Sequence, residues 1–125
     1  MIGSACRHQR KTMPRNMSFA ATQEQIKNKT KTVTRRLGWL FLKRGDELNA
    51  VNKTMGFKKG ESPIHLAKIR VVSIRQEPIA AITADDVRCE GFPEMSPNEF
   101  VSLFERINPK CTKETVVNRI EFEYQ

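Results

Sequence analysis

The stretch from residue 65 to residue 76, HLAKIRVVSIRQ, constrains the fold more than any other part of the chain. Neither glycine nor proline interrupts it, and most of its larger apolar side chains are β-branched. Such a run favours a long central strand that is buried on both faces. Pro78 follows, and because proline cannot donate to a strand ladder, we expect the chain to leave the sheet interior there. The apolar side chains of this run are Leu66, Ile69, Val71, Val72 and Ile74.

The segments before this strand carry their own helix and strand signals. Thr22 followed by Gln25 has the spacing of a capping box and predicts a helix from residue 22 to about residue 28. The β-branched TVT that comes next predicts a strand over residues 32–36. Glycine, proline and charge then predict a turn at 43–46, a strand at 47–53 and a loop at 55–63.

Two helices and a last strand are predicted after the central strand. Thr83, followed by two aspartates, suits a helix N-terminus. Ser96, Pro97 and Glu99 form a stronger start signal, with a cap, a proline in the first turn and a closing glutamate. An apolar helix face then comprises Phe100, Leu103, Phe104 and Ile107, while Ile120, Phe122 and Tyr124 alternate with Arg119, Glu121 and Glu123. Together these segments predict a compact α+β domain with a small curved sheet or a partly closed barrel.

The net charge of +8 is unevenly distributed over the 125 residues. Residues 1–16 hold four basic side chains and no acidic one, which leaves 18 basic and 14 acidic residues for the remainder. We therefore expect residues 1–16 to form a flexible basic N-terminal tail and residues 17–125 to form one domain. The tail either adds non-specific attraction to nucleic acid or is an upstream extension without a role.

Several protein classes are not favoured by the composition. Three widely spaced cysteines without a CxxC pair argue against a disulfide framework or a zinc site, and the two histidines add no metal-binding spacing. No segment approaches the roughly 20 apolar residues that a membrane span needs. We expect a cytoplasmic protein that uses no metal, no cofactor and no membrane.

Three short motifs carry a family resemblance. KTVTRR at 31–36, LKRGD at 42–46 and EGF at 90–92 occur in this order, and from about Met17 to Tyr124 the chain resembles the ASCH domain family of the PUA-like superfamily. The resemblance implies a small PUA-like β-barrel of about five or six strands with flanking short helices, and a cleft beside the first helix. ASCH domains are generally regarded as RNA-associated, and some small members are amidohydrolases that deacetylate acetylated cytidine nucleosides.

Carried over by motif, the working residues of those amidohydrolases fall on Lys31, Thr34 and Glu90. An amide hydrolase needs a nucleophile, a base and an acid, for which these residues would supply a hydroxyl, a neutral amine and a proton. Residues three apart on a regular strand point to opposite faces, so Lys31 and Thr34 can meet only if Lys31 lies in the bend after the helix or its long stem wraps around the strand. The alternative is that Lys31 is a solvated cation and Thr34 a structural β-former. After Thr34 the chain reads RRLGW and carries a MGFKKGE loop, which resembles a phage or prophage branch of the family.

Two functions are compatible with this sequence. The first is binding of RNA or a nucleotide in a cationic cleft, and the alternative is deacetylation of an acetylated cytidine nucleoside. Phosphate or base contacts would come from cations, and Phe57 would stack on a base unless it folds inward. Trp39 is expected in the core or in the cleft wall. The residues assigned to nucleic-acid binding are Lys29, Arg35, Arg36, Trp39, Phe57, Lys58 and Lys59. Both functions require Lys31 and Glu90 to share one concavity.

Overall fold

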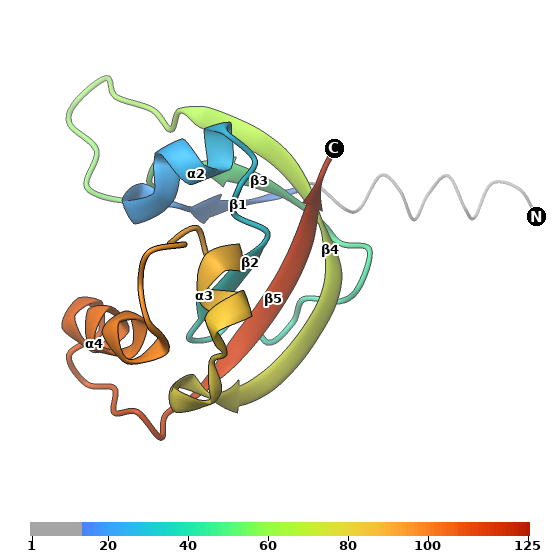
Figure 1. The fold of residues 1–125 in the computed structure, drawn as a ribbon. Coiled ribbons are helices and arrows are strands. Elements are labelled where there is room, and N and C mark those ends of the chain that lie inside the picture. The colour runs from blue at the N-terminus through green and yellow to red at the C-terminus, as the bar shows by residue number, and fades with distance from the viewer. Residues whose placement is uncertain (1–13) are drawn as a thin grey trace, which may run out of the picture.

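The computed structural model describes residues 14–125 as a curled five-stranded sheet with short helices on its concave side (Figure 1). The strand order is β1-β3-β4-β5-β2. This arrangement is the predicted α+β class, a barrel-like sheet with flanking short helices. The elements are β1 (Arg15–Ser18), η1 (Ala20–Thr22), α2 (Gln23–Lys27), β2 (Val33–Arg36), β3 (Glu47–Val51), β4 (His65–Pro78), η2 (Ile79–Ala81), α3 (Ala84–Cys89), α4 (Pro97–Ile107) and β5 (Val116–Tyr124).

Strand β4 is central, as the apolar run predicted, and pairs antiparallel with β3 and β5. Its register with β5 shifts between Val71 and Ser73, an irregularity that increases the bend of a strand. Ile69 and Val71 are buried, whereas the other apolar side chains of the run are only half-buried. Pro78 is the last residue of β4, in agreement with its predicted effect.

Strand β1 has no counterpart in the sequence predictions. It pairs parallel with β3, and of its four residues only Met17 is fully buried. A four-residue segment with one apolar side chain carries no periodic signal that could predict a strand. β1 is a strand because its backbone pairs with β3 at the edge of the sheet. β1 includes Arg15 and Asn16, the last residues of the segment expected to be a tail; residues 1–13 lie outside the described residues.

The helix start signals had different outcomes. The capping box of α4 is present, with Ser96 Oγ accepting from the Glu99 amide at 3.2 Å and Glu99 Oε1 accepting from the Ser96 amide at 2.8 Å. Thr83 caps α3 by accepting from the Asp86 amide. The capping box predicted at Thr22 is wrong, because the Thr22 side chain makes no cap hydrogen bond and is buried instead.

The apolar core forms two clusters. The larger lies inside the curl of the sheet, and the smaller joins α3 and α4 to one end of β5. No helix in the part of the chain that the structure describes is long and apolar enough to span a membrane. The buried members are Met17, Phe19, Ile26, Leu42, Leu48, Ala50, Ile69, Val71, Ile120 and Phe122 in the first cluster, and Ile79, Ile82, Val87, Phe100, Phe104 and Val117 in the second.

Candidate functional site

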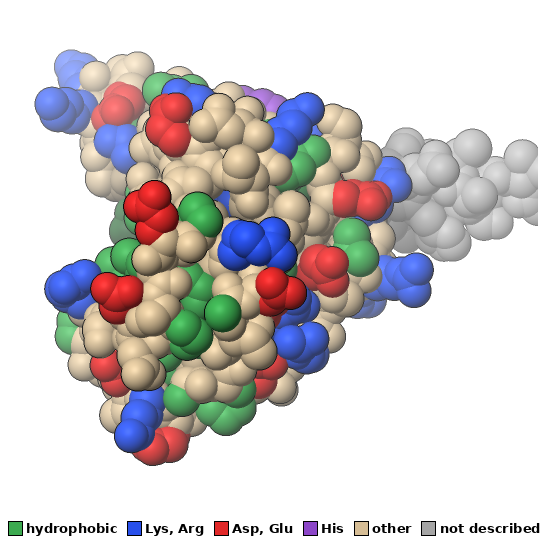
Figure 2. Space-filling model, in the orientation of Figure 1, with side chains coloured by type: hydrophobic (Ala, Val, Ile, Leu, Met, Phe, Trp, Pro, Cys, Tyr) green, Lys and Arg blue, Asp and Glu red, His purple; other side chains and the backbone are tan. Residues whose placement is uncertain are grey.

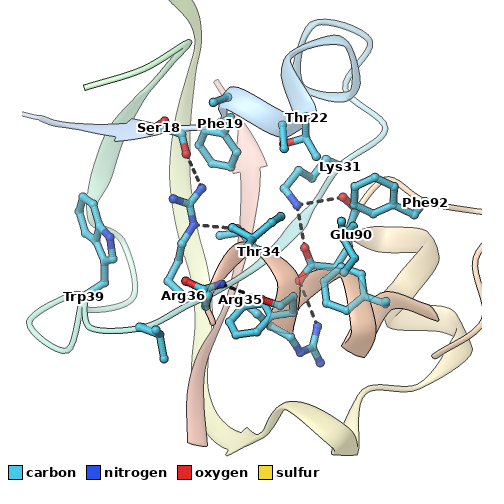
Figure 3. A pocket seen from close by; sticks show the side chains of 18 residues that line it. Ser18, Phe19, Thr22, Lys31, Thr34, Arg35, Arg36, Trp39, Glu90 and Phe92 are labelled. Carbon is cyan, nitrogen blue, oxygen red and sulfur yellow. Dashed lines mark hydrogen bonds and ion pairs between the residues drawn. The ribbon is translucent and has the colours of Figure 1, made fainter. Parts of the chain in front are cut away.

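A cavity of about 410 Å³ lies among η1, the segment leading into β2, and α4 (Figure 3). Its size falls within the range of about 300–1,000 Å³ that is usual for small-molecule sites. Most of its wall is apolar or aromatic, and a few polar side chains converge within it. The lining residues are Ser18, Phe19, Ala20, Ala21, Thr22, Lys31, Thr34, Arg35, Arg36, Leu37, Trp39, Glu90, Phe92, Phe100, Leu103, Phe104, Ile107 and Asn108.

Lys31 lies in the bend between α2 and β2, since β2 begins only at Val33. The Tyr124 hydroxyl donates to the Lys31 carbonyl at 2.5 Å, and this bond holds the bend against β5. Lys31 is therefore outside the regular strand, and strand alternation does not separate it from Thr34. Both side chains are buried and line the same cavity (Figure 3).

Lys31 and Glu90 form a buried pair. Lys31 Nζ donates to Glu90 Oε1 at 2.7 Å and to the Glu90 carbonyl at 2.9 Å, and each residue is 3% exposed. Burial lowers the pKa of the Lys31 ammonium from its ordinary value, and the Glu90 carboxylate offsets only part of that effect. The amine that lines the cavity is thus easier to deprotonate than an exposed lysine.

The backbone around Glu90 is bonded to the segment that carries Lys31. The Thr32 amide donates to the Cys89 carbonyl at 2.8 Å, and Gln25 Nε2 donates to the Gly91 carbonyl at 3.2 Å. Gly91 has a φ of +103°, a conformation that other residues rarely adopt, and this turn follows directly after Glu90. The EGF motif therefore positions Glu90 by a helix end and a glycine turn.

The Arg35 guanidinium points toward three acidic residues. Its Nη2 donates to Asp86 Oδ2 at 2.6 Å and to Glu77 Oε2 at 2.7 Å, and its Nη1 donates to Glu90 Oε2 at 3.3 Å. Arg119 binds the same Asp86 carboxylate through Nε at 2.6 Å and Nη2 at 3.0 Å. We call these five residues the Arg35 cluster.

Arg36 contacts Thr34 at the cavity wall. Arg36 Nε donates to Thr34 Oγ1 at 3.0 Å, Nη2 donates to the Ser18 carbonyl at 2.6 Å, and the guanidinium lies 4.7 Å from the centre of the Phe19 ring. Burial lowers the pKa of Arg36 to about 10, so the guanidinium remains charged at neutral pH. It thus places a positive charge beside the threonine hydroxyl.

The other predicted ligand-binding residues lie apart from the cavity, with one exception. Trp39 does line it, with a φ of +58° and a carbonyl that accepts from Asn118 Nδ2. Lys29 is exposed after α2, and Phe57, Lys58 and Lys59 are on the exposed loop between β3 and β4; none of these four lines the cavity. The space-filling view shows basic and acidic side chains interspersed, without a continuous cationic surface on that face (Figure 2).

Sequence reasoning missed much of the cavity wall. Phe19 and Phe92 lie on opposite sides of Lys31, and the apolar face of α4 lines the cavity as well as packing in the core. An amphipathic helix signals burial but does not say whether a cavity lies under it. The buried role of Asp86 and Arg119 also had no local signal, because their partners are 33 to 51 residues away.

Comparison with known proteins gives structural matches only. No protein-family model matches the chain, and no curated protein matches it in sequence. The solved structure of an ASCH domain from Lactobacillus crispatus superposes with a TM-score of 0.60 at 13% identity, covering 94% of this chain and 84% of that one. The chain has an ASCH-type, PUA-like fold.

Two further solved structures share this ASCH-type fold. The protein EF3133 from Enterococcus faecalis, of the family DUF984, matches with a TM-score of 0.63 and 13% identity over 90% of this chain and 77% of that one. The hypothetical protein PH0355 matches with a TM-score of 0.64 and 20% identity over 90% of this chain and all of that one. At these identities the similarity establishes the fold, and any function has to come from the site itself.

Proposed function

We propose that the cavity binds a nucleoside-sized molecule and that Lys31, Thr34 and Glu90 hydrolyse an amide bond in it. The observation that carries the proposal is the position of Lys31 Nζ, which is buried, paired with Glu90 and part of the same cavity wall as Thr34. A buried amine with a lowered pKa beside a hydroxyl is an arrangement suited to nucleophilic catalysis. An acetylated cytidine nucleoside, the substrate class suggested by the family resemblance, is the molecule to test first.

The charge balance favours a small molecule over an RNA backbone as the occupant of this cavity. Lys31, Arg35 and Arg119 contribute three positive charges, which Glu77, Asp86 and Glu90 balance with three negative ones. Arg36 is the one cavity-lining cation without an acidic partner among the described residues, and its donors are engaged by Thr34 and by the Ser18 carbonyl. A site that attracts polyphosphate normally presents uncompensated cations. The aromatic wall instead suits a base or another flat group.

The proposed reaction has two halves. Thr34 Oγ1 bonds to the amide carbon while Lys31 accepts the hydroxyl proton, and the C–N bond then breaks as Glu90 protonates the departing nitrogen. Water next attacks the Thr34 ester and gives one proton to Glu90; Lys31 returns its proton to Thr34 as the acid leaves. The reaction begins when the proton of the ion pair moves from Lys31 to Glu90 along their 2.7 Å hydrogen bond, so no outside proton is required.

Arg36 supports the first half of this reaction by its hydrogen bond to Thr34. Arg36 Nε donates to one lone pair of Thr34 Oγ1, so the hydroxyl hydrogen of Thr34 points in another direction. The positive charge of Arg36 also stabilises the Thr34 oxygen as its proton leaves. Figure 3 shows Thr34 between Arg36 and Lys31, the order that this role requires.

The direct test is incubation with acetylated and unmodified cytidine nucleosides, followed by mass spectrometry. We expect loss of the acetyl group and a fall in kcat of about 100-fold or more for Thr34→Ala and Lys31→Met. Thr32→Ala is the matched control, because Thr32 belongs to the same motif but does not line the cavity. Absence of turnover for every nucleoside of the panel, with the protein folded, would refute the hydrolase proposal.

A second candidate, RNA binding, is favoured by the exposed cations outside the cavity. Lys29, Lys58 and Lys59 have no acidic partner among the described residues. If they bind RNA, affinity for a short single strand falls as salt rises, and Lys58→Glu with Lys59→Glu flattens that dependence. Binding that does not change with salt or with these substitutions would exclude this candidate.

A further inference from the structure

The Arg35 side chain is fully enclosed and its contacts are internal. None of its side-chain surface is exposed, and both terminal nitrogens donate to carboxylates of the Arg35 cluster. Its Nε has no hydrogen-bond partner among the described residues. Burying a donor without a partner costs the free energy of removing it from water. We take this cost as the sign of a role that an apolar side chain of similar volume would not supply.

Asp86 and Arg119 fix the position of Arg35. Arg119, on β5, donates to the Asp86 carboxylate through two nitrogens. Asp86 Oδ2, which accepts from Arg119 Nε, also accepts from Arg35 Nη2. Two-point arginine–carboxylate contacts restrict orientation as well as adding energy. A rigid connection therefore runs from β5 through α3 to Arg35, and Arg35 in turn contacts the second oxygen of Glu90.

We propose that Arg35 is a positioning residue, which holds the Glu90 carboxylate against Lys31 and sets the charge of that amine, and that Asp86 balances Arg35. The catalytic consequence rests on the proposed hydrolase function. The effect on Lys31 can be measured without turnover, so the two proposals can fail separately.

The charged surroundings of Lys31 make the sign of each effect predictable. Glu90 faces it from the end of α3, and Arg35 and Arg36 face it from β2. Tyr124 reaches its carbonyl from β5 and stays a neutral phenol, because burial raises the pKa of Tyr124 to about 12.

The cavity residues of η1 and of α4 carry no charge, so they add nothing to this balance. Both arginines lower the pKa of Lys31, whereas Glu90 raises it. Removing Arg35 should therefore raise that pKa. Removing the charge of Asp86 leaves Arg35 with only Glu77 and Glu90 to balance it among the described residues and should lower the Lys31 pKa.

The experiment is NMR titration of ¹³Cε-labelled lysine in the full chain, with the Lys31 signal assigned by its loss in Lys31→Met. Wild type is compared with Arg35→Gln and Asp86→Asn, after thermal unfolding has shown that each variant is folded. Arg75→Gln is the matched control, because Arg75 also contacts Glu77 and approaches Asp86 but is 57% exposed and does not touch Glu90. Arg35→Lys, which keeps the charge, is a second control, and the downward shift expected in Asp86→Asn keeps the inference testable if Arg35→Gln does not fold.

We expect the Lys31 midpoint to move up in Arg35→Gln, to move down in Asp86→Asn, and to stay close to wild type in Arg75→Gln and Arg35→Lys. If the wild type is a hydrolase, kcat in Arg35→Gln falls, because a Lys31 with a higher pKa is less often the neutral amine that the reaction needs. The inference would be overturned if the Lys31 midpoint moved equally in Arg35→Gln and Asp86→Asn, or moved in neither. A merely structural role of Arg35 gives no reason for the two midpoints to move in opposite directions. Opposite shifts without any turnover would support the inference and count against the hydrolase.

Discussion

The backbone amide of Thr32 donates to the carbonyl of Cys89 at 2.8 Å, which joins the residues next to Lys31 and Glu90 by their main chains. The contact does not involve the side chain of either residue proposed to be catalytic. Replacing Lys31 or Glu90 should therefore leave the two segments docked and change only the charge and the hydrogen bonds within the cavity. Substitutions at these positions can thus report on chemistry and electrostatics in a folded protein.

Glu90→Gln should destabilise the protein by about 3 kcal/mol, because it leaves a buried amine without its counter-ion. In a Lys31→Met background the same change should cost clearly less, since the remaining partner, Arg35, still has Glu77 and Asp86. Urea unfolding of the wild type, both single variants and the double variant measures this coupling. Additive losses would show that the pair contributes no specific interaction.

Stability should decrease in acid in a way that depends on Asp86. Hydrogen bonds from Arg119 hold the pKa of the Asp86 carboxyl well below its usual range, with Arg35 adding to the effect. A carboxyl with a lowered folded-state pKa stabilises the protein above its unfolded pKa of about 4, and that contribution is lost as pH falls toward the folded value.

Urea unfolding between about pH 6 and pH 3 should therefore show a steeper loss for wild type than for Asp86→Asn. Asp85→Asn is the control, because Asp85 is exposed and, among residues 14–125, forms an ion pair only with Arg88 on the same helix. Equal slopes for wild type and Asp86→Asn would contradict the assignment.

Gly91→Ala should be more damaging than a substitution at an unconstrained glycine. Gly91 has a φ of +103°, and a Cβ there would lie 2.8 Å from Gln25 Cγ. Gly60, with a φ of +82° and no atom near the added Cβ, is the matched control.

We expect a loss of about 1 kcal/mol for Gly60→Ala and about 3 kcal/mol for Gly91→Ala, because only the latter adds overpacking to backbone strain. Truncation of Gln25 to alanine in the Gly91→Ala protein should recover part of the difference. Equal unfolding midpoints for the two alanine variants would show that the Gln25 side chain moves away from the added Cβ without a cost in stability.

Filling the cavity should prevent ligand binding without touching the polar residues. Leu103 lines the cavity, whereas Ser102 is its exposed neighbour on α4. Leu103→Trp should weaken nucleoside binding by at least about tenfold, since the added ring occupies space that the ligand needs. Ser102→Trp should bind normally in the same calorimetric titration. Unchanged affinity in Leu103→Trp would place the ligand elsewhere.

Local sequence signals were sufficient for most elements and for part of the site. Ser96 and Pro97 identified the start of α4, and the TVT block identified β2, because caps and β-branched runs act over a few residues. Thr22 fitted a capping pattern equally well, yet its environment is set by the cavity. Arg35 looked like a ligand-binding cation, since nothing near it in sequence reveals Glu77, 42 residues away, as its partner.

The hydrogen bond from Tyr124 to the Lys31 carbonyl has a consequence for biosynthesis. The bend that presents Lys31 is secured by a residue that the ribosome makes more than ninety positions later. Until β5 has left the ribosome, the nascent chain lacks both the Tyr124 hydrogen bond and the strand with which β2 pairs. Formation of the cavity is thereby tied to closure of the sheet by its last strand in sequence, and it cannot proceed stepwise from the N-terminus.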